Sequence, residues 1–364
     1  MKIIKGLVIY STDKETTFSY QKEWVNQLSN NKLFDCTLLN IWPRDSYHKL
    51  KNILTLKFRS FDAILIMHSV FSNTNRLNKH PLLFDLLVAS TTPKIFFMAN
   101  EYKSMPLKME FSKNLNISML VTQSYSKKVH SLYKNELRCE IIGLPNALVN
   151  TALFEPHFKQ NERGIDIGYR STSGPLYFGH QERSTIAEYF IDNSIKYDLK
   201  LDVSTNDSNR FSSKQWAEFL NNCKAILGTE SGYDYFETTD KTRLAVNKFI
   251  AENPSANFET VHKTFFEKYG AKIPMRVLSG RNVEAAATKT LQILFEGEYQ
   301  GYLKPDIHYI PLKKDFSNFD ETIKKFQDIR LVTQITNNAY DLVQSELHPN
   351  RIIENLHKHL LPLL

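Results

Sequence analysis

The decapeptide FDAILIMHSV, Phe61–Val70, carries the clearest fold signal in the sequence. Its apolar run from Ala63 to Met67 is too short for a helix and predicts a buried strand, with the polar His68 directly at the carboxyl end. Similar runs stand elsewhere in the first part of the chain, at Lys2–Tyr10, Lys94–Met98, Ile117–Val121 and Cys139–Ile142. The stretches between them are polar and long enough for helices, so the alternation predicts a parallel sheet covered by helices.

A second series of strand-like runs follows, at Ile165–Tyr169, Leu199–Val203, Ala225–Gly228, Met275–Leu278 and His308–Pro311. Helical patterns lie between these runs, as at Lys214–Asn222 and Arg281–Phe295. The polar stretch EPHFKQNERG, residues 155–164, has no periodicity and indicates a domain boundary within residues 150–164. The sequence therefore predicts two α/β domains at residues 1–155 and 156–335, followed by a helical segment at residues 336–364.

Composition limits the class of protein. The chain has 364 residues, 42% of them hydrophobic, which is enough to build two cores and excludes a disordered chain. Cys36, Cys139 and Cys223 show no C-x-x-C spacing, which argues against a disulfide framework and a structural zinc site and favours a cytoplasmic protein. We expect no transmembrane segment or signal peptide. The net charge of +7 favours an anionic partner, such as a nucleotide, a lipid headgroup, an acidic glycan or nucleic acid.

The positions of the glycines and the absence of common motifs narrow the choice of ligand. Of the twelve glycines only Gly6 precedes residue 143, and glycine lets the backbone approach a ligand closely, so the second domain is the expected nucleotide or phosphate binder. The sequence has no G-x-G-x-x-G, no G-x-x-x-x-G-K-[ST] and no H-E-x-x-H, and GTESG at Gly228–Gly232 lacks the spacing of a nucleophile elbow. It also has no D-x-D pair that would hold a metal on a diphosphate. Arginines, lysines and helix amino termini would then neutralise the phosphates.

Three segments resemble the carboxy-terminal domain of GT-B glycosyltransferases in order and spacing. GLPNALVNTALFEP, Gly143–Pro156, resembles the interdomain motif P-N-G-V-D-x-x-x-F-x-P, with one inserted residue and Asn150 at the usual aspartate. VEAAATKT, Val283–Thr290, resembles E-A-x-A-x-G-T. EGEYQGYLKPDIHYIPLKKDF, Glu296–Phe316, resembles the strand and loop that follow. The likeness is greatest to bacterial glycosyltransferases of surface-polysaccharide or glycan clusters and covers residues 140–330.

The resemblance implies a GT-B fold, in which two Rossmann-like domains with parallel sheets face an interdomain cleft. The first domain would bind the acceptor and the second a nucleotide-sugar donor, and the carboxy-terminal helical segment would cross back to the first domain. Glu284 is implied as the ligand of the donor ribose, because a carboxylate accepts hydrogen bonds from two hydroxyls. Arg281, three residues earlier, is the candidate diphosphate clamp. A surface ion pair between Arg281 and Glu284 is the structural alternative.

The family commonly carries another glutamate eight residues before the ribose-binding one, and Arg276 stands at that position. We therefore count Arg276 among the donor-binding candidates. The replacement leaves inversion and retention open.

Further donor candidates stand at strand ends of the second domain, where open α/β sheets bind ligands. Tyr169 and Arg170 end its first strand, and Arg170 is a candidate phosphate contact. His180 precedes the next expected helix and either touches the diphosphate or packs as a cap. Glu230 and Ser231 follow the strand AILG and are either donor contacts or ordinary turn residues.

Two strand ends of the first domain present candidate bases for an acceptor hydroxyl. Glu101 follows the run Lys94–Met98, and His68 follows Ala63–Met67. An inverting transfer needs a base, which Glu or His can supply, so Glu101 is the first candidate and His68 the second. The alternative for each is a structural side chain that bonds to neighbouring backbone amides.

Basic segments predict peripheral contact with an anionic membrane. YSKKVHSLYK, Tyr125–Lys134, and HFKQNER, His157–Arg163, would bring the protein to a lipid-linked acceptor at the cytoplasmic face of the inner membrane. The tail NRIIENLHKHLLPLL, Asn350–Leu364, is apolar at helical spacing, and we expect it to be the returning helix rather than a membrane foot. His357 and His359 are too isolated to indicate a metal site.

These features predict a metal-independent GT-B glycosyltransferase without a bound cofactor. It would transfer a sugar from a nucleotide sugar to a glycan or lipid-linked acceptor, in the synthesis of bacterial lipopolysaccharide or another surface polysaccharide. Two alternatives of the same fold are a noncatalytic sugar-nucleotide or glycan-binding protein and a sugar-nucleotide epimerase that needs no acceptor. A nucleic-acid-binding protein is favoured by charge alone and lacks an aromatic, basic recognition motif, so we expect no nucleic-acid partner.

Overall fold

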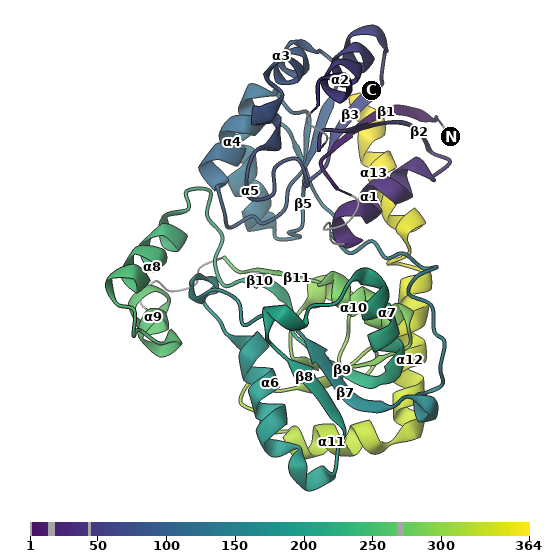
Figure 1. Cartoon of the computed structure of the whole chain (residues 1–364), viewed down its shortest axis with the longest axis vertical. Coiled ribbons are helices and arrows are strands. Elements are labelled where there is room, and N and C mark those ends of the chain that lie inside the picture. The colour runs from purple at the N-terminus through teal and green to yellow at the C-terminus, as the bar shows by residue number, and fades with distance from the viewer. Residues whose placement is uncertain (1, 14–18, 43–44, 268–272) are drawn as a thin grey trace. The chain divides into compact units, whose positions relative to one another are not determined.

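The chain forms two compact α/β units. A computed structural model describes residues 2–13, 19–42, 45–267 and 273–364. Unit 1 comprises Met1–Pro145, Phe236–Leu244 and Pro349–Leu364, and unit 2 comprises Asn146–Tyr235 and Ala245–His348. Each unit contains its own parallel sheet (Figure 1).

Unit 1 is built on a six-stranded parallel sheet in the order β2-β1-β3-β4-β5-β6. Its strands are β1 (Ile4–Tyr10), β2 (Phe34–Asn40), β3 (Ala63–Ile66), β4 (Lys94–Phe97), β5 (Met119–Thr122) and β6 (Glu140–Gly143). Its helices are α1 (Ser19–Ser29), α2 (Ser46–Phe58), α3 (Pro81–Ala89), α4 (Met105–Asn114), α5 (Lys127–Glu136) and α13 (Pro349–Leu360). Every residue of β3, β4 and β5 is buried, as expected for central strands covered on both faces. The predicted strands of this half are thus confirmed.

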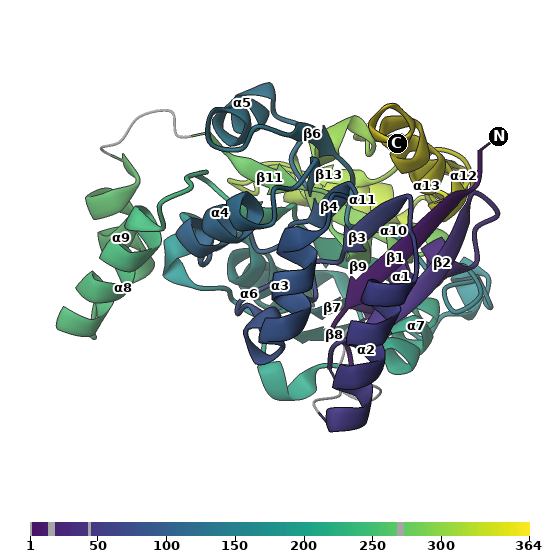
Figure 2. The same ribbon diagram turned by 90° about the horizontal axis from the view of Figure 1, so that it is seen from above.

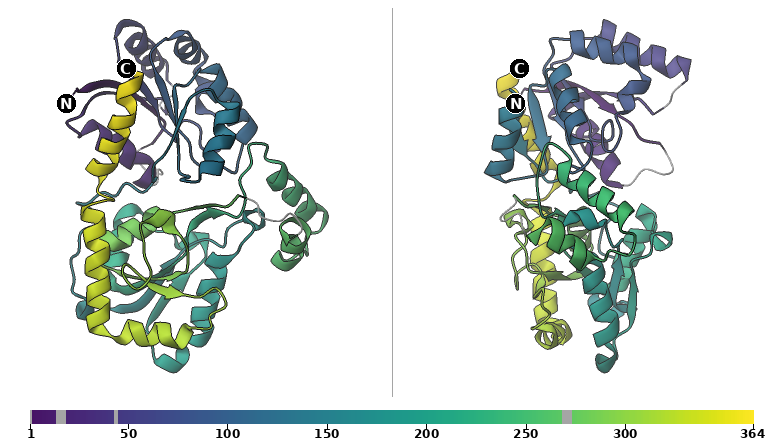
Figure 3. Two further views of the ribbon diagram at one scale, coloured as in Figure 1. Left: turned by 180° about the vertical axis from the view of Figure 1, so that it is seen from behind. Right: turned by 90° about the vertical axis from the view of Figure 1, so that its left-hand side faces the viewer.

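Two segments far along the sequence complete unit 1. Helix α13 packs against α1, and the two chain ends lie close together, where His357 Nε2 bonds to the Lys2 carbonyl at 2.8 Å (Figure 3). In the segment Phe236–Leu244, the Asp240 carboxylate accepts hydrogen bonds from the backbone N–H groups of Ser104 and Met105 at 2.7 and 3.1 Å. Asp240 therefore satisfies donors at the amino terminus of α4 that no helical carbonyl can reach.

Unit 2 contains a five-stranded parallel sheet in the order β13-β12-β9-β7-β8 and a separate antiparallel pair, β10-β11. Its strands are β7 (Ile165–Arg170), β8 (Leu201–Ser204), β9 (Cys223–Gly228), β10 (Ser231–Tyr233), β11 (Met275–Val277), β12 (Leu291–Phe295) and β13 (Ile310–Leu312). Its helices are α6 (Glu182–Asn193), α7 (Ser213–Asn222), α9 (Phe258–Phe265), α10 (Gly280–Ala287), α11 (Phe319–Gln327) and α12 (Ile329–Gln344), while α8 (Lys241–Glu252) begins in unit 1 and continues into unit 2. Side chains alternate along β9 and β12, so Ile226 and Leu294 join one core cluster, and Leu227 and Ile293 join the other.

Two predictions for this half were wrong. The expected helix Arg281–Phe295 ends as α10 at Ala287, because Lys289 takes a left-handed conformation, with φ of 53°. The remainder forms β12, which is buried throughout in the sheet. The expected strand at Met275–Leu278 forms β11, but it pairs antiparallel with β10 and does not join the parallel sheet. Helix α7, by contrast, confirms the prediction at Lys214–Asn222.

None of the helices in the described ranges is long and apolar enough to cross a lipid bilayer.

Candidate functional site

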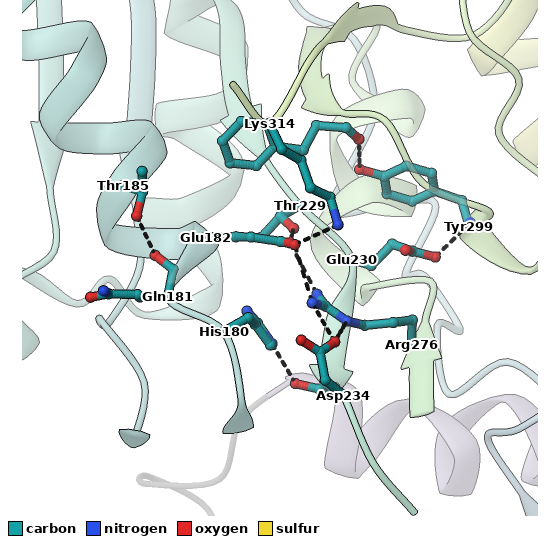
Figure 4. Close-up of polar contacts among 12 residues, drawn as sticks. His180, Gln181, Glu182, Thr185, Thr229, Glu230, Asp234, Arg276, Tyr299 and Lys314 are labelled. Carbon is teal, nitrogen blue, oxygen red and sulfur yellow. Dashed lines mark hydrogen bonds and ion pairs between the residues drawn. The ribbon is translucent and has the colours of Figure 1, made fainter. Parts of the chain in front are cut away.

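Polar side chains gather at the carboxyl edge of the parallel sheet of unit 2. They follow β7, β9 and β13 or stand at the amino termini of α6 and α10. The carboxyl ends of parallel strands share one edge of a sheet, and ligands of open α/β folds bind there. Two groups of contacts form, one around Glu182 and the other around Glu284 (Figure 4 shows the first).

Glu182 is the first residue of α6 and accepts bonds from several donors. Arg276 contacts both of its carboxylate oxygens, with Nη1–Oε2 at 3.0 Å and Nη2–Oε1 at 3.1 Å, and Lys314 Nζ lies 2.8 Å from Oε1 (Figure 4). The Thr229 hydroxyl also donates to Oε2. A carboxylate in the first turn of a helix is stabilised further by the helix dipole. The Glu182 carboxylate thus binds two cations and a hydroxyl at the amino terminus of a helix. All of these groups also bind phosphate.

Arg276 reaches Glu182 because β10 and β11 pair with Gly232 opposite Arg276. Gly232 has a φ of 106°, and a Cβ there would lie 1.8 Å from the Met275 carbonyl oxygen, so only glycine fits. The Arg276 guanidinium also contacts Asp234 Oδ1, from Nε at 2.7 Å and from Nη2 at 2.6 Å. Arg276 is therefore held between two carboxylates.

Electrostatics keep this network ionised. Burial opposes the charge of Glu182, but Arg276, Lys314 and Thr229 outweigh burial and lower the Glu182 pKa to about 2. Burial likewise opposes the charge of Arg276, and its two carboxylate partners raise the net pKa of its guanidinium.

We expect the contribution of Glu182 to stability to depend on pH. Its folded pKa of about 2 lies below the ordinary 4.5, so its stabilisation is complete above pH 4.5 and is lost as the pH falls toward 2. The full contribution is ~3 kcal/mol, of which roughly 1 kcal/mol is lost by pH 3.5. Urea unfolding of wild type and Glu182→Gln between pH 6 and 3.5 measures it. The stability difference between them should narrow with acidification, and a constant difference would contradict the assigned pKa.

Glu230 and His180 lie at the border of the same network. Glu230 Oε1 accepts the Tyr299 backbone N–H at 2.7 Å, and burial raises its pKa. His180 Nε2 donates to the Gly232 carbonyl at 3.1 Å, because a carbonyl oxygen can only accept. Burial and then the charge of Arg276 lower the His180 pKa, which favours the neutral ring. Ser231 opens β10 beside them and is half-buried.

The second group surrounds α10, whose N-cap Ser279 accepts the Arg281 backbone N–H. Trp216 from α7 donates its indole N–H to Glu284 Oε2 at 2.8 Å, and the Arg281 guanidinium carbon lies 5.9 Å from the centre of the Trp216 ring. Arg281 Nη1 also donates to the Arg170 carbonyl at 2.6 Å. Glu284 is half-buried and Arg281 is exposed. The predicted ribose ligand and the predicted diphosphate clamp therefore both contact Trp216.

The side chains of Arg170 and Tyr169 are held by contacts within unit 2. Arg170 Nη2 contacts Asp202 Oδ1 at 2.6 Å, and its guanidinium lies over the rings of Phe211 and Phe219. Its side chain stabilises the sheet end in this structure, while its carbonyl holds Arg281. Tyr169 is buried, and burial raises the pKa of its hydroxyl.

The two base candidates lie at the carboxyl ends of the neighbouring strands β3 and β4 of unit 1, and both are buried. Glu101 accepts hydrogen bonds from the Thr122 hydroxyl at 2.6 Å, from the Gln123 backbone N–H at 3.0 Å and from the Tyr133 hydroxyl. Burial raises the Glu101 pKa despite these bonds. Burial also lowers the pKa of His68 to about 4.

Sequence reasoning missed four charged or aromatic members of the two groups: Glu182, Asp234, Lys314 and Trp216. The local sequence could have pointed to Glu182, because an acidic residue that follows a glycine turn is typical of the amino terminus of a helix. Gly179 makes that turn with a φ of 81°. The other three are brought in by strand pairing and helix packing, which no local pattern shows.

Within the parts of the chain that the structure describes, no group of three or more His, Cys, Asp or Glu side chains is arranged to hold a metal ion.

Two Rossmann-like units with parallel sheets, joined in this order and with the last helix back on unit 1, define the GT-B fold. Solved structures agree. HepE of Anabaena in complex with UDP is 8% identical over 98% of this chain and 100% of its own, with a TM-score of 0.53. Sucrose-phosphate synthase of Thermosynechococcus elongatus is 10% identical over 99% of this chain and 100% of its own, with a TM-score of 0.53. A glycosyltransferase of Rickettsia africae is 12% identical over 99% of both chains, with a TM-score of 0.50. These likenesses confirm the fold that the sequence predicts.

The chain also matches TarM at 10% identity and a TM-score of 0.46, over 86% of this chain and 58% of TarM, so it spans less than two thirds of that protein. No protein-family model matches the sequence, and no curated protein matches it.

Proposed function

We propose that the protein is a glycosyltransferase that moves a sugar from a nucleotide-sugar donor to a glycan or lipid-linked acceptor. The observation that carries the proposal is the set of cations at the carboxyl edge of the unit 2 sheet in a GT-B fold: Arg276, Arg281 and Lys314. HepE, which shares the fold, is seen with UDP and with UDP-glucose, which makes uridine nucleotides the first donors to test.

We propose specific donor contacts within this edge. Glu284 would bind the ribose hydroxyls, and Arg281, exposed beside it, would bind the diphosphate. Lys314 is exposed and contacts only one oxygen of Glu182, so it can turn toward a phosphate at small cost. Arg276 would act mainly by fixing Glu182 and the start of α6. Catalysis would rest on positioning and on stabilising the leaving diphosphate, without a metal ion.

The acceptor would bind to unit 1, at the cytoplasmic face of a membrane. Glu101 and His68 stay predictions as bases for its hydroxyl. Their burial and the bonds to Glu101 favour structural roles for both.

The donor site is tested by thermal shift against UDP, GDP, CMP, ADP and dTDP, with and without EDTA. We expect one nucleotide to stabilise the protein by about 2.7 kcal/mol at a hundredfold excess over Kd, with or without chelator. Glu284→Ala and Arg281→Ala should each weaken the binding of that nucleotide by at least about tenfold, because each removes a charged contact.

Matched controls are Glu188→Ala and Arg330→Ala, which remove the same two residue types at exposed positions on α6 and α12 and should bind normally. Loss of stabilisation in the controls as well would show that the effect is not specific to the carboxyl edge of the unit 2 sheet. Absence of any nucleotide effect on the folded wild type would sink the donor assignment and favour a glycan-binding protein. Binding without transfer or donor hydrolysis indicates a noncatalytic protein, and donor conversion without acceptor indicates an epimerase.

A further inference from the structure

Helix α2 of unit 1 turns four large apolar side chains outward. Tyr47, Leu50, Leu54 and Phe58 are 70%, 56%, 44% and 72% exposed, and we call these four residues the α2 ridge. Their spacing of three, four and four residues places them along one face of a helix. A surface helix normally buries such a stripe against the core. The α2 ridge is therefore not accounted for by packing within the described chain.

The inward face of α2 mixes polar and apolar side chains. Asn52 is buried and donates to the Asn40 carbonyl at 3.3 Å, while Ile53 and Leu56 are half-buried. The α2 ridge is thus a second apolar face, on the outer side of the helix. Four exposed large apolar side chains in one stripe are also more than the scattered single residues normal for a surface, and such patches mark contact surfaces.

Charge favours an anionic partner for the α2 ridge. Residues Ser46–Phe58 contain three lysines and neither Asp nor Glu. Lys51 and Lys57 are exposed and project on either side of the ridge, and the exposed Arg59 follows the helix end. An apolar stripe bordered by cations fits the boundary between lipid headgroups and acyl chains of an anionic bilayer, where the apolar residues insert and the lysines meet phosphates.

The neighbouring helix also exposes apolar side chains. Helices α2 and α3 pack side by side (Figures 1 and 2), and Leu82 and Val88 of α3 are exposed large apolar residues.

The basic segments singled out in the sequence lack this combination. Helix α5 exposes Lys127 and Lys128, but its buried residues, Val129 and Tyr133, face inward. In the segment 157–163 the Arg163 guanidinium is buried and donates to the carbonyls of Leu220, Cys223 and Thr288. Neither segment joins cations to an exposed apolar stripe.

We infer that the α2 ridge, with Lys51 and Lys57, docks unit 1 on an anionic membrane surface. This inference goes beyond the proposed reaction and holds whichever sugar is transferred. It also supplies the membrane contact that a lipid-linked acceptor requires.

Vesicle flotation tests the inference without measuring activity. Wild type is mixed with vesicles of phosphatidylcholine, with or without phosphatidylglycerol, at low and high salt. We expect flotation with the anionic vesicles that decreases with salt. Leu54→Glu/Phe58→Glu should reduce the vesicle partition coefficient by at least about tenfold, because two apolar contacts are lost and two negative charges are added. Lys51→Gln/Lys57→Gln should reduce it by about twenty-five-fold, since each lysine near an anionic surface contributes about fivefold.

Two control variants separate the ridge from general effects. Leu107→Glu/Ile195→Glu makes the same chemical change at exposed positions outside the ridge, and Lys127→Gln/Lys128→Gln removes two charges from α5. Both should float like wild type. The inference is overturned if wild type does not float, if the ridge variant floats normally, or if the α5 variant is the one that loses binding. It is also overturned if light scattering shows that the ridge variant converts a dimer to a monomer, because the ridge then binds a second copy of the chain.

Discussion

Arg276→Ala is expected to lower the free energy of unfolding of unit 2 by about 3–5 kcal/mol, the usual cost of removing one partner of a buried ion pair. The guanidinium contacts both Glu182 and Asp234, and its own side chain is only 12% exposed. Without it two carboxylates would share a partly buried space with Lys314 as the remaining cation nearby. The cost comes from uncompensated charge rather than from lost attraction alone.

Thermal unfolding measures this loss, and for a unit of this size the midpoint should fall by roughly 10 °C. Hydrogen exchange should locate the loosened amides at β10, β11 and the start of α6. Arg281→Ala is the matched control, because Arg281 is an exposed arginine of the same edge and should change stability by less than about 0.5 kcal/mol. A drop below 1 kcal/mol for Arg276→Ala would show that the network is not held together by this residue.

Together the two arginine variants separate support from binding. Arg281→Ala should lose nucleotide stabilisation while the free protein melts normally. Arg276→Ala should lower the melting temperature of the free protein itself. If the effects are reversed, Arg276 is the diphosphate contact and Arg281 is the structural residue.

The central strands could be predicted from the sequence because they are buried on both faces. Runs such as Ala63–Met67 are then continuously apolar, which distinguishes them from their polar surroundings. Strand β2 (Phe34–Asn40) was not predicted because it lies at the sheet edge, where buried and exposed residues mix. Strand β12 was not predicted for the opposite reason. Its apolar residues continue the helical pattern of α10, and only the left-handed Lys289 separates the two elements.

The candidate site was less accessible to prediction because its contacts are long-range. Arg276 meets Asp234 across 42 residues and Glu182 across 94. These pairs depend on the register of β10 with β11 and on where α6 begins. A family motif could point to Glu284 and Arg281 because both stand on one short helix. No local pattern indicates that Glu182 shares Arg276 and Lys314.

The buried setting of Glu101 leads to the second large expected effect. Its carboxylate accepts three hydrogen bonds in unit 1. The neighbouring Lys108 is also buried, donates to the Ala99 and Asn100 carbonyls, and has a pKa that burial lowers to about 7. We expect Glu101→Ala to destabilise unit 1 by about 3–5 kcal/mol, because it leaves buried donors unsatisfied and removes a nearby counter-charge from Lys108.

Glu101→Gln distinguishes support from catalysis. The amide keeps an oxygen for the Gln123 N–H, and the Thr122 and Tyr133 hydroxyls can rotate, so the loss of stability should be only about 1–2 kcal/mol. A carboxamide cannot take a proton from an acceptor hydroxyl, so a catalytic Glu101 would lose sugar transfer almost completely in this variant. We expect the folded Glu101→Gln protein to retain transfer within a few-fold of wild type, with Glu110→Gln, an exposed glutamate of α4, as the control. Abolished transfer at near-normal stability, with unaltered nucleotide binding, would instead establish Glu101 as the base. The buried carboxylate would then have to become accessible when the acceptor binds.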